Sequence, residues 1–342
     1  MSRDRNGAFD RQVTRRTVLK GAAAAGVALP FAGRLTGSVG AQDTLKIAFS
    51  VPGLNFPFFV HMMDLAKAHA ESIGGIEFIP LDGQQSGQPS STKQSADLEA
   101  MIAEKVNGVV ISPNDVNALQ PAIQAVIDAG IPVVTVDRNV IGATTLAHVG
   151  ADNVEGGREQ GRYLVEILPD GGEIFELQGA PGASPAIDRD KGLKEIINAQ
   201  DKIKIVVDQT GQFTREGGLS VTESALAAHP DPKAIVAAND EMAFGAMEAA
   251  ADAGLTVPII GFDALPEALV AIRDGKLVAT IEQFPGGQAQ GAIDVLVAKL
   301  RDGKDPAQHD NFLTPKLITK DNLAEAERAV EAGVAPAASP TA

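Results

Sequence analysis

The sequence predicts an α/β protein built as two Rossmann-like lobes, each around a parallel sheet. The first observation is that short apolar runs alternate with amphipathic stretches of about 10–15 residues, the pattern of βαβ units. The second is that the 342-residue chain contains more of these units than one sheet of ordinary size holds. The third is that polar side chains follow several strands, where ligands of such sheets bind.

The expected strands are short and apolar, with many Val and Ile residues. They lie at residues 45–50, 76–80, 108–111, 133–136, 172–177, 203–207, 234–237, 259–262 and 279–282. The expected helices carry apolar residues on one face. They lie at residues 56–73, 91–104, 119–129, 155–167, 186–197, 216–228, 241–253, 267–274 and 288–300. The Gly-rich segment 286–291 lacks a nucleotide-binding fingerprint and is interpreted as a loop that enters the last helix.

Residues 1–41 have the three parts of an export signal. The segment TRRTVLK at 14–20 resembles the twin-arginine motif, an apolar stretch rich in Ala and Gly follows, and Val39-Gly40-Ala41 resembles a cleavage site. We therefore expect a periplasmic protein exported by the twin-arginine route, the alternative being a disordered basic tail. Because the chain has no cysteine, it lacks disulfides, thiolate metal sites and a lipid-modifiable cysteine.

The composition argues against several classes of function. With 29 basic and 44 acidic residues and a net charge of −15, the chain is poorly suited to bind nucleic acid. We expect no membrane insertion, because no uninterrupted apolar run after the export signal is long enough to span a bilayer. The five histidines lack metal-ligand spacing. Paired carboxylates, a Gly-x-Ser-x-Gly elbow and a phosphate loop are also missing, so we expect no catalytic residue, metal or cofactor.

Polar side chains follow four of the expected strands at the point where each strand ends. They are Asp137 and Arg138, Asn239 and Asp240, Asp263, and Gln283. The carboxyl ends of parallel strands meet at one edge of a sheet, where ligands bind. A set of Asp, Arg, Asn and Gln side chains suits a small, neutral ligand with many hydroxyl groups, because these groups donate and accept hydrogen bonds.

Motifs in a fixed order extend this pattern over more than two hundred residues. They are NFPFF at 55–59, VDR at 136–138, ADN at 151–153, ELQG at 176–179, ANDEMA at 238–243, GFD at 261–263, DGKL at 274–277 and ATI at 279–281. Each motif is short, but the ordered set resembles the periplasmic sugar-binding proteins of the ribose-binding type, which supply ABC importers. The resemblance covers nearly the whole chain after the export signal.

The resemblance implies a fold and its boundaries. Two α/β lobes would be joined by a hinge with three crossings, near residues 150–152, 283–285 and 311–316. Lobe one would comprise residues 42–151 plus 284–312, and lobe two residues 152–283 plus 313–325. Residues 326–342 would form a C-terminal tail, and its Pro-, Ala- and Ser-rich end is expected to be disordered.

The resemblance also implies roles for aromatic residues. Phe58 and Phe59 would cover one apolar face of a sugar ring, and Phe213 would cover the other. Phe56 and Ser112 stand where the family has two sugar-contacting asparagines, so ribose itself is in doubt. Another pentose, a hexose, a deoxy sugar or a cyclic polyol fits the sequence equally well. Alternatively, the phenylalanines belong to the hydrophobic core.

The polar residues would bind the hydroxyl groups. Asp137 and Asp263 would accept hydrogen bonds, Arg138 and Arg189 would donate them, and Asn239 and Gln283 would do both; these residues complete the expected site. Two Asp and two Arg side chains sum to zero charge, which favours a neutral monosaccharide or polyol. The alternatives are a surface salt bridge for Asp137–Arg138 and a solvated helix start for Arg189.

The implied function is capture of a neutral sugar or polyol by hinge closure, followed by delivery to an ABC permease with its ATPase. The binding protein would act as a monomer. The alternatives are a receptor that reports to a chemosensor or a signalling kinase, a sugar-converting enzyme, and a sugar-responsive repressor. The repressor would need a basic helix-turn-helix before the first lobe, where this chain carries its export signal.

Overall fold

The computed structural model describes residues 44–336. It contains two parallel β-sheets, and helices cover both faces of each sheet. This architecture confirms the predicted fold class. The expected export signal at residues 1–41 and the last six residues, 337–342, lie outside the described residues.

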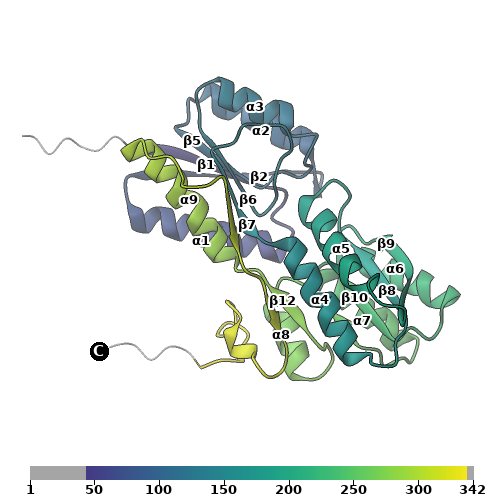
Figure 1. The fold of residues 1–342 in the computed structure, drawn as a ribbon. Coiled ribbons are helices and arrows are strands. Elements are labelled where there is room, and N and C mark those ends of the chain that lie inside the picture. Colours follow the sequence, from purple (N-terminus) through teal and green to yellow (C-terminus); the bar gives the residue numbers. More distant parts are fainter. Residues whose placement is uncertain (1–43, 337–342) are drawn as a thin grey trace, which may run out of the picture. The chain divides into compact units, whose positions relative to one another are not determined.

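The first sheet contains six parallel strands in the order β13-β7-β6-β5-β1-β2. They are β1 (Leu45–Val51), β2 (Ile76–Asp82), β5 (Gly108–Ile111), β6 (Val133–Val136), β7 (Ala147–Ala151) and β13 (Asp310–Leu313). The helices α1 (Pro57–Ile73) and α9 (Pro285–Asp302) cover one face, and α2 (Ser91–Ala103) and α3 (Gln120–Asp128) cover the other (Figure 1). Because side chains alternate along a strand, Val110 packs with α1 and α9, whereas Val109 and Ile111 pack with α2 and α3.

The second sheet contains four parallel strands in the order β11-β10-β8-β9. They are β8 (Gly172–Gln178), β9 (Ile203–Thr210), β10 (Ala234–Ala237) and β11 (Ile259–Ile260). Its helices are α4 (Asn153–Ile167), α5 (Ser184–Ile197), α6 (Arg215–Ala228), α7 (Asp240–Asp252) and α8 (Pro266–Arg273). The helices α4 and α5 pack on one face, and α6 to α8 pack on the other.

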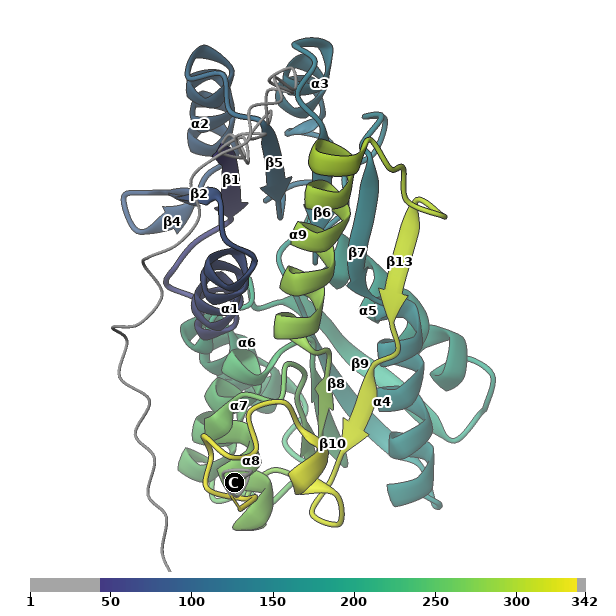
Figure 2. The same ribbon diagram turned by 90° about the vertical axis from the view of Figure 1, so that its left-hand side faces the viewer.

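The chain passes between the two sheets three times. It leaves the first sheet after β7, returns to it after β12 (Thr280–Glu282), and leaves it again after β13 to form β14 (Lys316–Ile318) (Figure 2). The strands β12 and β14 pair antiparallel, and a parallel bridge between Ile260 and Ala279 joins β12 to the second sheet. The exact lobe boundaries stay a prediction.

Several elements differ from the sequence prediction. The strands β7 and β13 were not predicted, because a buried His interrupts β7 and β13 is a largely polar edge strand. A short hairpin of β3 (Gln84–Gln85) and β4 (Gln88–Pro89) was also missed. The interpretation of residues 286–291 as a loop is wrong. Pro285 starts α9, and the glycines that follow lie in its first turns.

The segment after β14 packs against the second crossing. It includes a 3₁₀ turn at Leu323–Glu325 and two buried alanines, Ala326 and Ala329. The Glu327 carboxylate accepts hydrogen bonds from Gly286 N at 3.0 and 3.2 Å, and it lies 3.0 Å from His61 Nε2 of α1. In return, Glu282 Oε2 accepts from Glu327 N at 2.8 Å. The segment after β14 is therefore bonded to both elements that flank this crossing.

Candidate ligand-binding site

The predicted site residues come together around one cavity. All of them except Ser112 line it, and Pro185 joins them; they are Phe56, Phe58, Phe59, Asp137, Arg138, Arg189, Phe213, Asn239, Asp263 and Gln283. The cavity encloses about 340 Å³ including its open mouth. The structure thus gathers side chains from both sheets at the carboxyl ends of their strands.

Two residues differ from the predicted lining of the cavity. Ser112 lies behind the cavity wall, where its Oγ donates a hydrogen bond to Asp137 Oδ2 at 3.3 Å. Pro185 was not predicted; it sits in the first turn of α5, close to Arg189 in the sequence. The sequence could have indicated Pro185, because it follows Ser184 at the start of a helix that comes after a strand. Helix starts of this kind face the ligand-binding edge of a parallel sheet.

The backbone is strained at three residues that line the cavity. Asp137, Phe213 and Asp263 have φ angles of 60°, 61° and 111°, which side chains with a Cβ seldom adopt. Each such conformation costs on the order of 1–3 kcal/mol and persists where the surroundings enforce it. Strain of this kind clusters at functional sites, which supports the assignment of the cavity.

Phenylalanine rings form two walls of the cavity. The Phe58 and Phe59 rings at the start of α1 meet edge to face at 5.2 Å, and Phe56 meets Phe59 at 6.2 Å. Phe213 comes from the other lobe, and a Cβ at Gly179 would overlap its ring, so that position needs glycine. The rings also belong to the hydrophobic core, as the alternative interpretation of them expects, and their role in covering a sugar ring stays a prediction.

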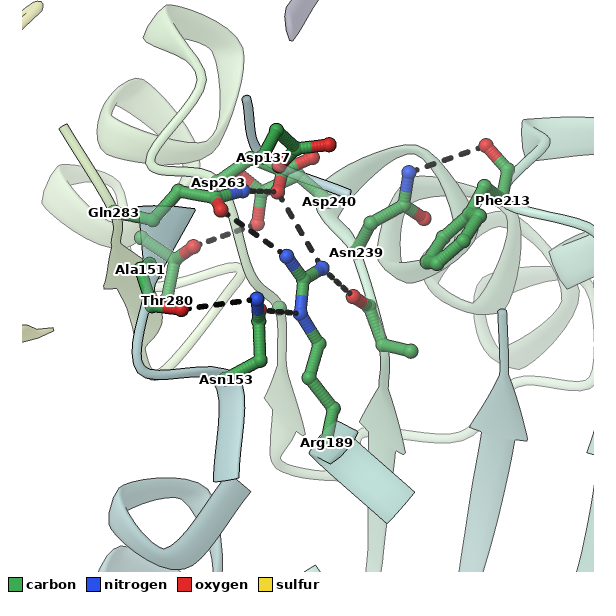
Figure 3. Close-up of polar contacts among 12 residues, drawn as sticks. Asp137, Ala151, Asn153, Arg189, Phe213, Asn239, Asp240, Asp263, Thr280 and Gln283 are labelled. Atoms are coloured by element: carbon green, nitrogen blue, oxygen red, sulfur yellow. Dashed lines mark hydrogen bonds and ion pairs between the residues drawn. The ribbon is translucent and has the colours of Figure 1, made fainter. Parts of the chain in front are cut away.

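Arg189 is fixed by contacts on all sides of its guanidinium (Figure 3). Its Nε donates to Asn153 Oδ1 at 2.8 Å, its Nη1 to Ala238 O at 2.6 Å, and its Nη2 to Gln283 Oε1 at 3.2 Å. Its Nη1 also lies 3.7 Å from Asp263 Oδ1. The guanidinium stacks 3.6 Å from the centre of the Phe262 ring. The side chain is 4% exposed, which excludes a solvated helix start.

Gln283 and Asn239 are largely engaged by the protein. Gln283 Nε2 donates to Asp263 Oδ1 at 2.6 Å, while its Oε1 accepts from Arg189. Asn239 caps α7: its Oδ1 accepts from Met242 N at 3.0 Å, and its Nδ2 donates to Phe213 O at 3.1 Å. One amide hydrogen of Asn239 is therefore available to a ligand, whereas its Oδ1 is used to cap α7.

Arg138 is much less engaged than Arg189. Its Nη1 donates to Asn114 O at 3.3 Å, and its Nε lies 3.8 Å from Asp137 Oδ2. Among residues 44–336, no group accepts a hydrogen bond from its buried Nε. The guanidinium lies 5.3 Å from the Phe59 ring centre and 5.6 Å from that of Phe213. Arg138 and Asp137 are each 4% exposed, so they are not a surface salt bridge.

Burial shifts the ionisation of these groups. It raises the pKa of Asp137, against the opposing charge of Arg138, and raises the pKa of Asp263 to about 7. Burial also lowers the pKa of Arg138 to about 10, so this guanidinium stays charged at neutral pH. Behind the cavity, burial raises the pKa of Asp240, whose carboxylate accepts from Thr280 Oγ1 at 2.7 Å and Leu265 N at 2.8 Å.

A cluster of acidic residues outside the cavity is paired with a lysine side chain. Within residues 44–336, Glu176, Asp190 and Asp208 are near enough to one another to share a metal ion. The Lys194 ammonium lies between them, 2.5 Å from Asp190, 2.6 Å from Asp208 and 3.6 Å from Glu176. The lysine therefore supplies a positive charge at the centre of the cluster. None of the helices in the described part of the chain has the length and apolarity of a membrane span.

Comparison with known proteins identifies the family. Residues 47–305 match the family described as periplasmic binding protein domain. The chain is 37% identical over 246 residues to the ribose import binding protein of Bacillus subtilis (strain 168), covering 72% of this chain and 78% of that protein. It is 34% identical over 281 residues to that of Salmonella typhimurium (strain LT2), covering 82% and 92%.

A solved structure agrees with these sequence relatives. The structure of the Caulobacter myo-inositol binding protein bound to myo-inositol superimposes with a TM-score of 0.78 and 37% identity, covering 86% of this chain and 100% of that one. The family match spans most of the chain, and the strand order and the cavity at the strand ends agree with it. The chain therefore belongs to the periplasmic binding protein family.

Proposed function

We propose that this protein is the solute-binding component of an ABC importer and that it binds a neutral monosaccharide or polyol. The observation that carries the proposal is the buried Asp137–Arg138 pair, which lines the cavity while most of its hydrogen-bonding capacity remains available. A buried donor without a partner is costly, so a ligand that supplies hydroxyl acceptors is favoured. Relatives named for ribose and myo-inositol support the same class of cargo.

Charge balance supports a neutral cargo. The cavity is lined by Asp137 and Asp263 and by Arg138 and Arg189, whose charges cancel when both carboxyls are ionised. A sugar acid or a phosphate would place an additional negative charge beside the two carboxylates in a buried site, where repulsion is poorly screened. The aromatic walls would cover the C–H faces of a ring, and the polar groups would bind its hydroxyls.

The proposal extends to export and assembly. Family membership implies a periplasmic location, and the twin-arginine motif at residues 14–20 supports export by that route. The protein would act as a monomer, because one chain supplies every lining residue of the cavity. It would bind its cargo between the lobes and deliver it to a permease driven by an ATPase.

A thermal-shift screen tests the cargo class. A ligand at about 100 times its Kd stabilises the native state by about 2.7 kcal/mol, which raises the melting temperature by several degrees. The panel would contain myo-inositol, D-ribose and other neutral sugars, with D-glucuronate and D-ribose 5-phosphate as charged controls. We expect a large shift from a neutral compound. A shift caused only by charged compounds would contradict the proposal.

A further inference from the structure

A buried amide supports the lobe-one residues of the cavity from behind. Gln94 lies on α2, is fully buried and does not line the cavity. Its Nε2 donates to Ser50 Oγ at 3.1 Å and to Ser112 O at 3.0 Å, and its Oε1 accepts from Asn114 N at 2.8 Å. Gln94 thus ties the end of β1 to the segment 112–114 that follows β5.

This segment contacts both charged residues of lobe one. Ser112 Oγ donates to Asp137 Oδ2 at 3.3 Å. Asn114 accepts from Arg138 Nη1, through its main-chain O at 3.3 Å and its Oδ1 at 3.5 Å. The position of the Arg138 guanidinium therefore depends on where segment 112–114 lies, because Asn114 is its one hydrogen-bond acceptor among the described residues.

We propose that Gln94 is a positioning residue that orients Arg138, and through Ser112 Asp137, for hydroxyl recognition; this inference rests on the proposed function. A guanidinium discriminates between hydroxyl patterns because its donors form a rigid fork. Loss of the amide would free Asn114 N and Ser112 O, and segment 112–114 would move to find other partners. The fork would then lose its fixed direction, although Gln94 never touches the cargo.

Lobe two offers a matched control. Gln160 lies on α4, is also buried, and donates through Nε2 to Ala237 O at 3.0 Å and Gly261 O at 2.9 Å. Gln160→Met and Gln94→Met each remove a buried amide that bonds main-chain groups near strand ends. General effects on stability should therefore be similar, whereas an effect on Arg138 should be specific to Gln94.

The first test needs no ligand. The ¹⁵N–¹H signal of the Arg138 Nε–H group would be assigned by its loss in Arg138→Lys and followed in the full-length protein. We expect Gln94→Met to shift or broaden this signal, and Gln160→Met to leave it in place. An unchanged Arg138 signal in folded Gln94→Met, or equal changes in both variants, would overturn the inference.

A second variant keeps the test valid if Gln94→Met folds poorly. A protonated Glu at position 94 can donate to Ser112 O and accept from Asn114 N, whereas the ionised form cannot donate. Burial favours the protonated form of a carboxyl. We expect Gln94→Glu to show the wild-type Arg138 signal at about pH 5 and a displaced signal at about pH 8. A signal displaced equally at both pH values would contradict the inference.

A double-mutant cycle of Gln94 and Arg138, measured with myo-inositol as the ligand, tests whether the orientation of Arg138 affects affinity. We expect Gln94→Met to weaken binding about tenfold and to cause little further loss in the Arg138→Lys background, because coupled residues are not additive. Fully additive losses would show that Gln94 does not act through Arg138. Failure of the wild-type protein to bind any neutral compound would count against the proposed function, while the Arg138 signal would still decide the inference.

Discussion

The two arginines of the cleft differ in how far the protein itself uses their donors. Arg189 bonds to Asn153, to the Ala238 carbonyl and to Gln283, so it is part of the lobe-two framework. Arg138 donates through Nη1 to two oxygens of Asn114, and its buried Nε has no acceptor within residues 44–336. At the scale of single residues, Arg189 builds the site and Arg138 is the side chain with donors left for a ligand.

Replacement of Arg138 tests this difference. Arg138→Lys keeps the charge but removes the planar fork, and each hydrogen bond to a charged group contributes about 1.5–3 kcal/mol. We expect affinity for the neutral compound found by the screen to fall by at least about tenfold, with a melting temperature of the ligand-free protein close to wild type. Isothermal titration measures the loss. If the folded variant bound with wild-type affinity, Arg138 would not be a ligand-binding residue.

Asp263 should make binding depend on pH. Burial raises its pKa to about 7, so the folded, ligand-free protein retains a proton that the unfolded chain releases at lower pH. Its contribution to stability therefore falls as the pH rises from about 4 to about 7. Hydroxyl donors favour the ionised carboxylate, so affinity should increase with pH over the same range and binding should release protons.

Titration in buffers of different ionisation enthalpy detects this proton release. Asp263→Asn removes the titrating group at similar size, so the pH dependence of its affinity should be flatter than in the wild type. A wild-type affinity that is constant between about pH 5.5 and about pH 8 would show that neither Asp263 nor Asp137 changes ionisation on binding.

The sequence could predict which residues lie at the strand ends, because that depends on local alternation alone. It could not predict what each side chain does there. Asn239 follows a strand and also starts a helix, and only the geometry shows that its oxygen caps that helix. The pattern of polar residues at strand ends could not indicate Gln94, because the fold brings its partners, such as Asn114, into contact with it.

At the scale of elements, close packing of α4 against α5 places Arg189 in the site. A Cβ at Gly192 would overlap the main-chain O of Val154, and a Cβ at Gly157 would overlap that of Arg189. These glycines allow the two helix backbones to approach, and Arg189 then reaches Asn153 at the start of α4. Glycine in a helix interior is usually unfavourable, so the close approach is the reason for these residues.

A single methyl group tests this packing. An interior Gly→Ala change ordinarily stabilises a helix by about 1 kcal/mol. Gly192→Ala should instead destabilise the protein, because forced overpacking costs about 1–3 kcal/mol, and it should weaken binding by displacing Arg189. Thermal unfolding and isothermal titration measure both effects.

The control for this change is Gly291→Ala in α9, where the nearest atom to a new Cβ is a methyl group of Val149 at 3.2 Å. It should be close to neutral in stability and in affinity, because a side-chain methyl can shift more easily than backbone. If Gly192→Ala behaved like Gly291→Ala, the close approach of α4 and α5 would not be what places Arg189.

At this scale the sequence predicted the nine α-helices of residues 44–336, because each carries apolar residues on one face, but it missed the first turns of α9 and the 3₁₀ turn at Leu323–Glu325. It missed β7 and β13, which lie side by side at the edge of the first sheet. His148 of β7 is buried against Thr135 through a 3.0 Å contact, an arrangement that alternation of apolar residues cannot indicate. Such strands are stabilised by their neighbours in the sheet, and their own composition carries little signal.

At the scale of the whole molecule, two hydrogen bonds link the two lobes beside the cavity. Val116 N donates to Gly182 O at 2.9 Å, and Asn139 N donates to Ser184 Oγ at 2.9 Å. Val116 and Asn139 follow strands of the first sheet, Gly182 lies between β8 and α5, and Ser184 is the first residue of α5. These bonds would form on closure, as expected of a family for which hinge motion is a known example.

Hydrogen exchange tests closure directly. If ligand binding closes the lobes, the amides of Val116 and Asn139 should exchange more slowly in the presence of a bound neutral compound, because their bonds then open less often. The amide of Val110, in the centre of the first sheet, provides an internal control and should change little. Equal protection of Val116 and Asn139 with and without ligand would show that binding does not alter this contact.

The most direct test of the central claim is a crystal structure of the protein with the neutral compound that stabilises it most. We predict that the compound lies in the cavity with its ring between Phe59 and Phe213, and that its hydroxyls bond to Asp137 and to Arg138 Nε or Nη. A compound bound outside this cavity, or one inside it without a hydrogen bond to Asp137 or Arg138, would contradict the account.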